Sequence, residues 1–145
     1  MSIQPAIART LLDTDIFSEF LRGRNATVAN RAARYQRAHG RFTISAITLM
    51  EMSSGWQRRG HPARITSVLQ QIITWDVLAL DGEIAALAGR IDGDLIRTGQ
   101  AIGVADALIA ATALHHGLVL ATGNGTHYQR LPPLGYAVQI DDWRA

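Results

Sequence analysis

The sequence contains no cysteine, which excludes disulfide bonds, thiolate chemistry and cysteine-ligated zinc. It also lacks lysine: all 14 basic side chains are arginine, against 12 acidic ones, and the formal net charge is +2. Long apolar runs are missing as well, because Asp13 and Asp15 interrupt the first candidate segment and Asp106 the last. We therefore expect a cytoplasmic protein that makes no contact with a membrane.

Charge is unevenly distributed along the chain. Residues 1–64 contain ten arginines and four acidic residues, a balance of +6, whereas residues 65–145 contain four and eight, a balance of −4. Guanidinium groups pair well with phosphate oxygens, so the basic half is consistent with a phosphate-binding surface. Solvated helix faces in an arginine-preferring genome explain the same composition. Charge alone does not separate the two interpretations.

Short apolar runs alternate with amphipathic segments. The runs predict five strands, at residues 10–12, 42–45, 77–80, 118–121 and 137–140. Apolar residues at helical spacing predict helices that begin near residue 16 and that span 26–39, 46–59, 62–73, 82–98 and 104–116. This alternation predicts an α/β fold, a Rossmann-like central parallel sheet of about five short strands with helices on both faces. We expect residues 1–145 to form one domain, since no repeat or linker interrupts them.

Acidic residues fall where ligands bind in such folds, at the carboxyl ends of the strands. Asp13 ends the first predicted strand, and Asp15 follows two residues later. Glu51 lies in an otherwise apolar helix that follows the second strand, and Asp106 lies in another that follows Gly103. Asn124 directly follows the fourth strand. Parallel strands with right-handed crossovers bring these positions to one edge of the sheet.

Carboxylates gathered at a partly buried edge repel one another, and a hard divalent cation such as Mg²⁺ or Mn²⁺ offsets that repulsion. A metal ion in such a site activates water and stabilises the charge of a phosphodiester under attack. Taken singly, Asp15 and Asp106 are also explained as acids favoured by a helix N-terminus, and Glu51 as a surface residue. Their coincidence at one edge favours the metal site.

Four segments in order resemble the PIN-domain ribonucleases, in particular the VapC toxins of type II toxin–antitoxin systems. They are LLDTDIFSEFLRG at 11–23, TISAITLMEMSSG at 43–55, GVADALIAATALHHGLVLATGN at 103–124 and VQID at 138–141. The resemblance covers nearly the whole chain, and the third segment is the most specific. It implies a PIN-like fold.

The resemblance also implies roles for individual residues. Asp13, Glu51 and Asp106 match the metal-binding acids, and with Asn124 they make up the expected catalytic set. The family commonly has asparagine where this chain has Asp15, and many members have an acid near Asn124. The resemblance therefore implies one metal ion, or a second one completed by the substrate phosphate. The supporting polar residues expected beside the acids are Thr14, Asp15 and Thr122.

The implied activity is Mg²⁺- or Mn²⁺-dependent endonucleolytic hydrolysis of RNA, with structured RNA such as tRNA as the substrate class. The implied partners are a cognate antitoxin and a second copy of the chain, as a homodimer or in a higher assembly with the antitoxin. Apolar positions in the helices at 46–56 and 62–73 exceed what one helix face needs, and part of that surplus suits a partner helix. The arginines expected to guide RNA to the acids are Arg22, Arg24, Arg31, Arg34 and Arg37.

Two other interpretations concern function. A non-catalytic PIN-like module that binds RNA or protein is the main alternative, favoured by Asn124 in place of an acid. Phosphatases of the haloacid-dehalogenase type and receiver domains also place acids after the first strand. Both normally use a lysine beside the phosphoryl group, and this chain has none.

Overall fold

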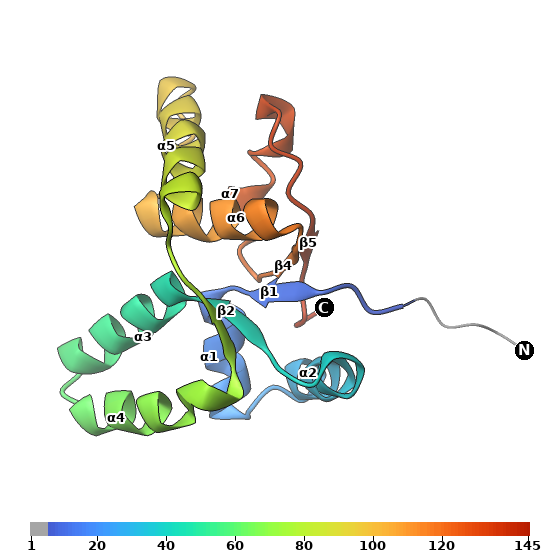
Figure 1. The fold of residues 1–145 in the computed structure, drawn as a ribbon, viewed down its shortest axis with the longest axis vertical. Coiled ribbons are helices and arrows are strands. Elements are labelled where there is room, and N and C mark those ends of the chain that lie inside the picture. The colour runs from blue at the N-terminus through green and yellow to red at the C-terminus, as the bar shows by residue number, and fades with distance from the viewer. Residues whose placement is uncertain (1–5) are drawn as a thin grey trace, which may run out of the picture.

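Five short parallel strands form one sheet in the computed structural model, which describes residues 6–145 (Figure 1). They are β1 (Thr10–Leu12), β2 (Thr43–Ser45), β3 (Asp76–Leu78), β4 (Val119–Ala121) and β5 (Ile140–Asp141), in the order β3-β2-β1-β4-β5. Every neighbouring pair is parallel. The predicted α/β class and parallel sheet are confirmed.

Between the strands lie the helices α1 (Thr14–Arg22), α2 (Ala26–His39), α3 (Ala46–Arg58), α4 (Pro62–Gln71), α5 (Gly82–Arg97), α6 (Val104–His116) and α7 (Gly125–Tyr128). Two short 3₁₀ helices, η1 (Ile72–Thr74) and η2 (Pro132–Leu134), complete the described elements. Within residues 6–145, no helix has the length and apolar character that crossing a membrane requires.

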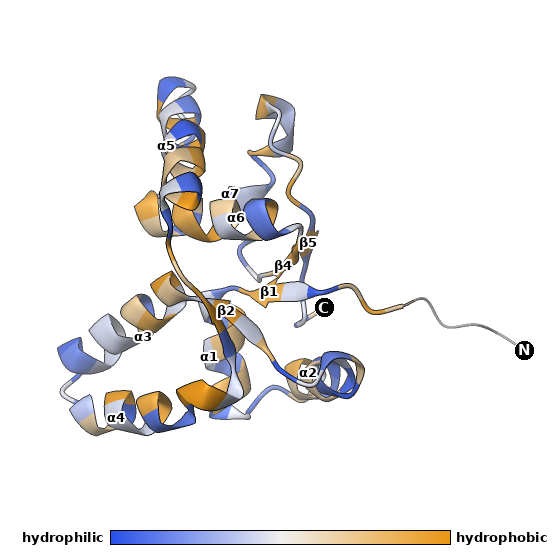
Figure 2. Cartoon of the chain, viewed as in Figure 1, coloured by the Kyte–Doolittle hydropathy of each residue, from blue (hydrophilic) through white to orange (hydrophobic). Residues whose placement is uncertain are grey.

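The central strand β1 separates two hydrophobic cores. Successive side chains of a strand point to opposite faces. Leu11 accordingly belongs to the core that contains residues of α5 and α6, and Leu12 to the core that contains residues of α1 and α2. Hydrophobic residues make up most of the inner strands, whereas the helices carry both kinds (Figure 2). Burial on both faces explains why Leu11 and Leu12 of β1 are both apolar, without alternation.

The largest differences from the predicted boundaries have identifiable reasons. The third strand is residues 76–78 and not 77–80, because the N–H of Asp76 already bonds to the carbonyl of Phe42. The fifth strand is residues 140–141 and not 137–140, since the N–H of Val138 bonds to the carbonyl of Tyr136 in a turn. The helix predicted at 62–73 ends as α4 at Gln71 and continues as η1.

Candidate active site

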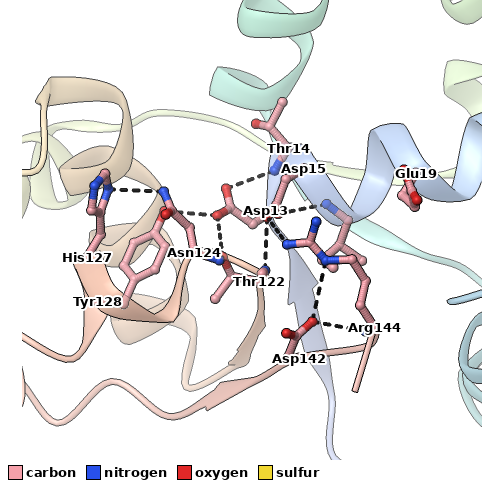
Figure 3. A network of polar contacts seen from close by, with 12 residues as sticks. Asp13, Thr14, Asp15, Glu19, Thr122, Asn124, His127, Tyr128, Asp142 and Arg144 are labelled. Atoms are coloured by element: carbon pink, nitrogen blue, oxygen red, sulfur yellow. Dashed lines mark hydrogen bonds and ion pairs between the residues drawn. The ribbon is translucent and has the colours of Figure 1, made fainter. Parts of the chain in front are cut away.

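Asp13 occupies the junction of β1 and α1, where it caps the helix. Its Oδ1 accepts a hydrogen bond of 2.8 Å from the N–H of Thr14. Its Oδ2 accepts two more, from the hydroxyl of Thr122 at 2.8 Å and from the hydroxyl of Tyr128 at 3.1 Å (Figure 3). The residue is only 4% exposed. Three donors from three segments therefore hold one buried carboxylate in place.

The charge on this carboxylate is nevertheless destabilised. Burial, followed by the negative charge of Asp15 and more weakly that of Asp106, raises the pKa of Asp13 to about 7. The hydrogen bonds from Thr122 and Thr14 lower the pKa and offset only part of this effect. The surroundings of the carboxylate therefore favour the binding of a positive charge beside it.

Asp106 lies in the first turn of α6, on the same side of the sheet as Asp13. The Nδ1 of His127 lies 2.8 Å from its Oδ2, and the Nδ2 of Asn124 lies 3.5 Å from the same atom. The Nδ1 of His127 is also 3.0 Å from the Nδ2 of Asn124. The short contact with a carboxylate favours the tautomer with the hydrogen on Nδ1. His127 therefore orients Asp106, and Asn124 adds a longer contact to the same oxygen; with this tautomer the 3.0 Å contact joins two donors and is not a hydrogen bond.

Glu51 reaches the same edge from α3 but by way of Thr14. The hydroxyl of Thr14 donates to Oε1 of Glu51 at 2.6 Å and lies 3.0 Å from the hydroxyl of the buried Thr48. Because Thr14 uses its hydrogen for Glu51, Thr48 is the donor in the second contact. Glu51 is thus tied to the residue next to Asp13 and not to Asp13 itself.

Asp15 faces a different set of donors from Asp13. Its Oδ1 accepts from the N–H of Ile16 at 2.7 Å, and its Oδ2 accepts from the N–H of Gly123 at 2.9 Å and from Arg144 at 3.2 Å (Figure 3). Burial raises the pKa of Asp15, and these three donors oppose that rise. The guanidinium of Arg144 occupies the space beside Gly123: a Cβ there would lie 1.1 Å from its Nη2.

Carboxylate oxygens, the ligands that a divalent metal ion such as Mg²⁺ prefers, are present at this edge, but their positions limit how many of them can bind one ion. Within residues 6–145, no three His, Asp or Glu side chains are grouped closely enough to hold a metal ion. The predicted trio of Asp13, Glu51 and Asp106 is therefore not gathered into one cluster. Mg²⁺ commonly binds through one or two carboxylates and keeps several waters. Asp13 and Asp106, which repel each other, fit that mode.

Three side chains of the site were not among the predicted site residues. Tyr128 and His127 belong to α7, a helix of four residues that is too short to produce a periodic pattern. Asn124 directly precedes this helix, and an asparagine at that position was the available sequence signal. Arg144 lies 129 residues from Asp15, and no local pattern connects them.

Two of the predicted RNA-binding arginines have acidic partners within the chain. Arg22 pairs with Glu19, and Arg31 pairs with Asp141 and lies 6.0 Å from the ring centre of Trp143. The ion pairs found between residues 6 and 145 do not include the remaining three, Arg24, Arg34 and Arg37.

Fold and site together define a class of protein: an α/β domain with two mutually repelling acids, one buried and one partly buried, at the carboxyl edge of its sheet, as in metal-dependent phosphodiesterases. The family model of the PIN domain matches residues 10–132, and the chain belongs to this family. Nucleases of the PIN family generally use a divalent metal ion.

Proteins similar to this chain in sequence and in structure support the resemblance to VapC. The chain is 31% identical over 134 residues to the tRNA(fMet)-specific endonuclease VapC of Shigella flexneri, covering 92% of this chain and 96% of that protein. The structure of DNA-bound VapBC from Salmonella typhimurium matches with a TM-score of 0.78 and 30% identity, over 94% of this chain and 99% of the other. The VapBC-1 structure from nontypeable Haemophilus influenzae matches with a TM-score of 0.76 and 27% identity, over 94% and 98%. The predicted PIN-like fold is confirmed.

Proposed function

We propose that this chain is a Mg²⁺-dependent endoribonuclease toxin that a cognate antitoxin neutralises. The observation that carries the proposal is the buried carboxylate of Asp13, whose pKa is raised by burial and by neighbouring acids at the carboxyl edge of the sheet. A site that only bound a partner has no use for such repulsion. The Shigella relative is named as a tRNA endonuclease, which supports structured RNA as the substrate class.

In this proposal Asp13 and Asp106 hold the metal ion directly. A bound divalent ion lowers the pKa of a water and stabilises the negative charge that develops on the phosphate. Thr14, Thr122 and Tyr128 keep Asp13 oriented. Glu51 has one oxygen bonded to Thr14, and we assign its other oxygen to a water of the site.

Asn124 and His127 keep Asp106 in place, and Asp15 is held by Gly123 and Arg144. Mn²⁺ offers the same preference for oxygen ligands and should replace Mg²⁺. The four residues expected to be catalytic thus divide into two that bind metal, Glu51 that binds water, and Asn124 that orients Asp106.

An antitoxin and a second copy of the chain are the proposed partners. Met50 on α3 and Leu69 on α4 are 53% and 52% exposed, and such side chains suit burial against an amphipathic partner helix. The Salmonella and Haemophilus structures are named VapBC, which supports an antitoxin partner. The homodimer rests on the resemblance alone.

Cleavage of total RNA by the purified chain tests the enzymatic part. We expect cutting with Mg²⁺ or Mn²⁺ and none with EDTA. The Asp106→Asn variant should lose cutting, whereas Asp92→Asn, the same chemical change on α5, should keep it. A folded wild-type chain that binds RNA but never cuts it would establish the alternative, a non-catalytic binding module.

Growth of bacteria that express the chain tests the toxin part. The wild type should arrest growth, and the product of the neighbouring gene should relieve the arrest. Asp106→Asn should be harmless and still co-purify with that product. A wild-type chain that is harmless by itself and binds no neighbouring product would refute the toxin assignment and leave the nuclease assignment standing.

A further inference from the structure

A pocket of about 300 Å³ lies between α1, α3 and α4 and begins at the acidic edge. Thr14 and Glu51, the hydrogen-bonded pair of the candidate active site, form part of its wall. The pocket therefore connects directly with the place where a phosphodiester would be cut. Its volume is at the lower end of the range for small-ligand sites, roughly 300–1,000 Å³.

The rest of the wall is rich in arginine. Arg58, Arg59 and Arg64 line the pocket, and none of them is among the ion pairs found between residues 6 and 145. The Nη2 atoms of Arg59 and Arg58 lie 3.8 and 4.0 Å from the position of a Cβ on Gly55, so both guanidinium groups fold over this buried glycine. Arg22 also lines the pocket but pairs with Glu19, so three of the four arginines around this hollow have no such acidic partner among the described ion pairs.

An aromatic surface completes the pocket. Trp56 lines it and is partly exposed, whereas the other two tryptophans, Trp75 and Trp143, are only 7% and 2% exposed. Guanidinium groups bind phosphate oxygens, and an exposed indole ring stacks on a nucleobase. The combination of these groups next to an acidic site matches a nucleotide better than an apolar peptide.

We propose that this pocket is a subsite for one nucleotide of the RNA strand beside the cleavage point, with its phosphate on Arg58, Arg59 and Arg64 and its base against Trp56. The inference rests on the proposed ribonuclease function. It specifies which side chains bind the RNA strand. These arginines belong to α3, to α4 and to the turn between them, and none was among the RNA-binding arginines predicted from the sequence.

Binding of hexa-adenylate RNA in EDTA tests the subsite without cleavage. Tryptophan fluorescence should be quenched as RNA is added, and Trp56→Phe should remove the quenching because the two other tryptophans are buried. Trp56→Ala should weaken binding about fivefold or more. Each of Arg58→Ala, Arg59→Ala and Arg64→Ala should weaken it about tenfold and lower the salt slope by about 0.7.

Arg90→Ala is the matched control, because Arg90 is exposed on α5, outside the pocket. It should bind RNA as the wild type does. Melting temperatures of all variants verify folding. The exposed arginines should not affect it, whereas Trp56→Ala also removes packing against the core, which Trp56→Phe largely keeps. RNA affinity and salt slope that match the wild type in the three arginine variants would overturn the subsite, even if the chain cuts RNA. Variants that bind RNA normally but lose the antitoxin would assign the pocket to the protein partner instead.

The reverse result separates the two proposals. A chain whose RNA affinity depends on Trp56 and the three arginines, but which cuts no RNA with Mg²⁺, would keep the subsite and refute the ribonuclease. A wild-type chain that does not bind the RNA at all would overturn the subsite directly.

Discussion

Tyr128 donates its hydroxyl hydrogen to the buried carboxylate of Asp13, a residue 115 positions earlier in the chain, at 3.1 Å. Burial raises the pKa of Tyr128, and the negative charge of Asp13 raises it further, so the tyrosine stays a neutral donor. The contact joins α7 to the end of β1. It makes the shortest α-helix of the described chain a structural part of the acidic site.

Removal of the Tyr128 hydroxyl should lower the free energy of unfolding by an amount that depends on pH. At pH 8, where Asp13 is largely charged, Tyr128→Phe leaves the carboxylate one donor short and should cost about 1–2 kcal/mol of unfolding free energy. At pH 5 Asp13 is protonated in the folded state, and the loss should be smaller. Urea unfolding at both pH values measures the difference. An equal loss at both would mean that the hydroxyl does not act through the charge of Asp13.

The stability of the metal-free protein should fall as the pH rises from about 5 to about 8. The pKa of Asp13 is about 7 in the folded chain, whereas the ordinary value for an aspartate side chain is 3.8. A pKa raised by folding means that the folded state prefers the protonated form, so the stabilisation present at low pH is lost as the pH passes through 7. Thermal melting in EDTA checks this.

Mg²⁺ should reverse the effect, because a bound cation stabilises the charged form of Asp13. The melting temperature should therefore rise more on addition of Mg²⁺ at pH 8 than at pH 5.5. Asp13→Asn is the control. Its melting temperature should show neither this fall with rising pH nor the rise on addition of Mg²⁺. A Mg²⁺ response of equal size in this variant would place the ion elsewhere.

Asp106→Asn should lower the rate of RNA cleavage by orders of magnitude, because it removes half of the charged pair proposed to hold the metal. Without metal, its melting temperature should equal or exceed that of the wild type, since a carboxylate that raises the pKa of Asp13 has gone. Cleavage kinetics and thermal melting are measured on the same preparation. Full activity would remove the metal-site hypothesis.

Gly123→Ala should behave like Arg144→Ala. A Cβ on Gly123 would collide with the guanidinium of Arg144 and displace it from Asp15. Because the Asp15–Arg144 pair is partly exposed, either change should cost less than about 1 kcal/mol. A double-mutant cycle measures the coupling, and the double variant should be no less stable than either single one. Additive losses would show that the two residues act independently.

The strand and helix pattern of this protein was largely predictable from the sequence, because burial makes the inner parallel strands short and mainly apolar. The same logic placed Asp13 at the end of β1 and Asp106 at the start of α6. Where a boundary depended on a partner, as at Asp76, prediction failed, since the hydrogen bond from its N–H to Phe42 is a property of two strands and not of one.

Only the tertiary structure decided how the acids are grouped. The sequence predicted that Glu51 joins Asp13 and Asp106, but the packing of α3 directs Glu51 to the hydroxyl of Thr14. It also decided that Tyr128 contacts Asp13 and that Arg144 contacts Asp15. Local periodicity determines which residues face the edge of a sheet. Side-chain rotamers and helix packing determine the ångström-scale distances that decide which of those residues share a metal ion, a hydrogen bond or a proton.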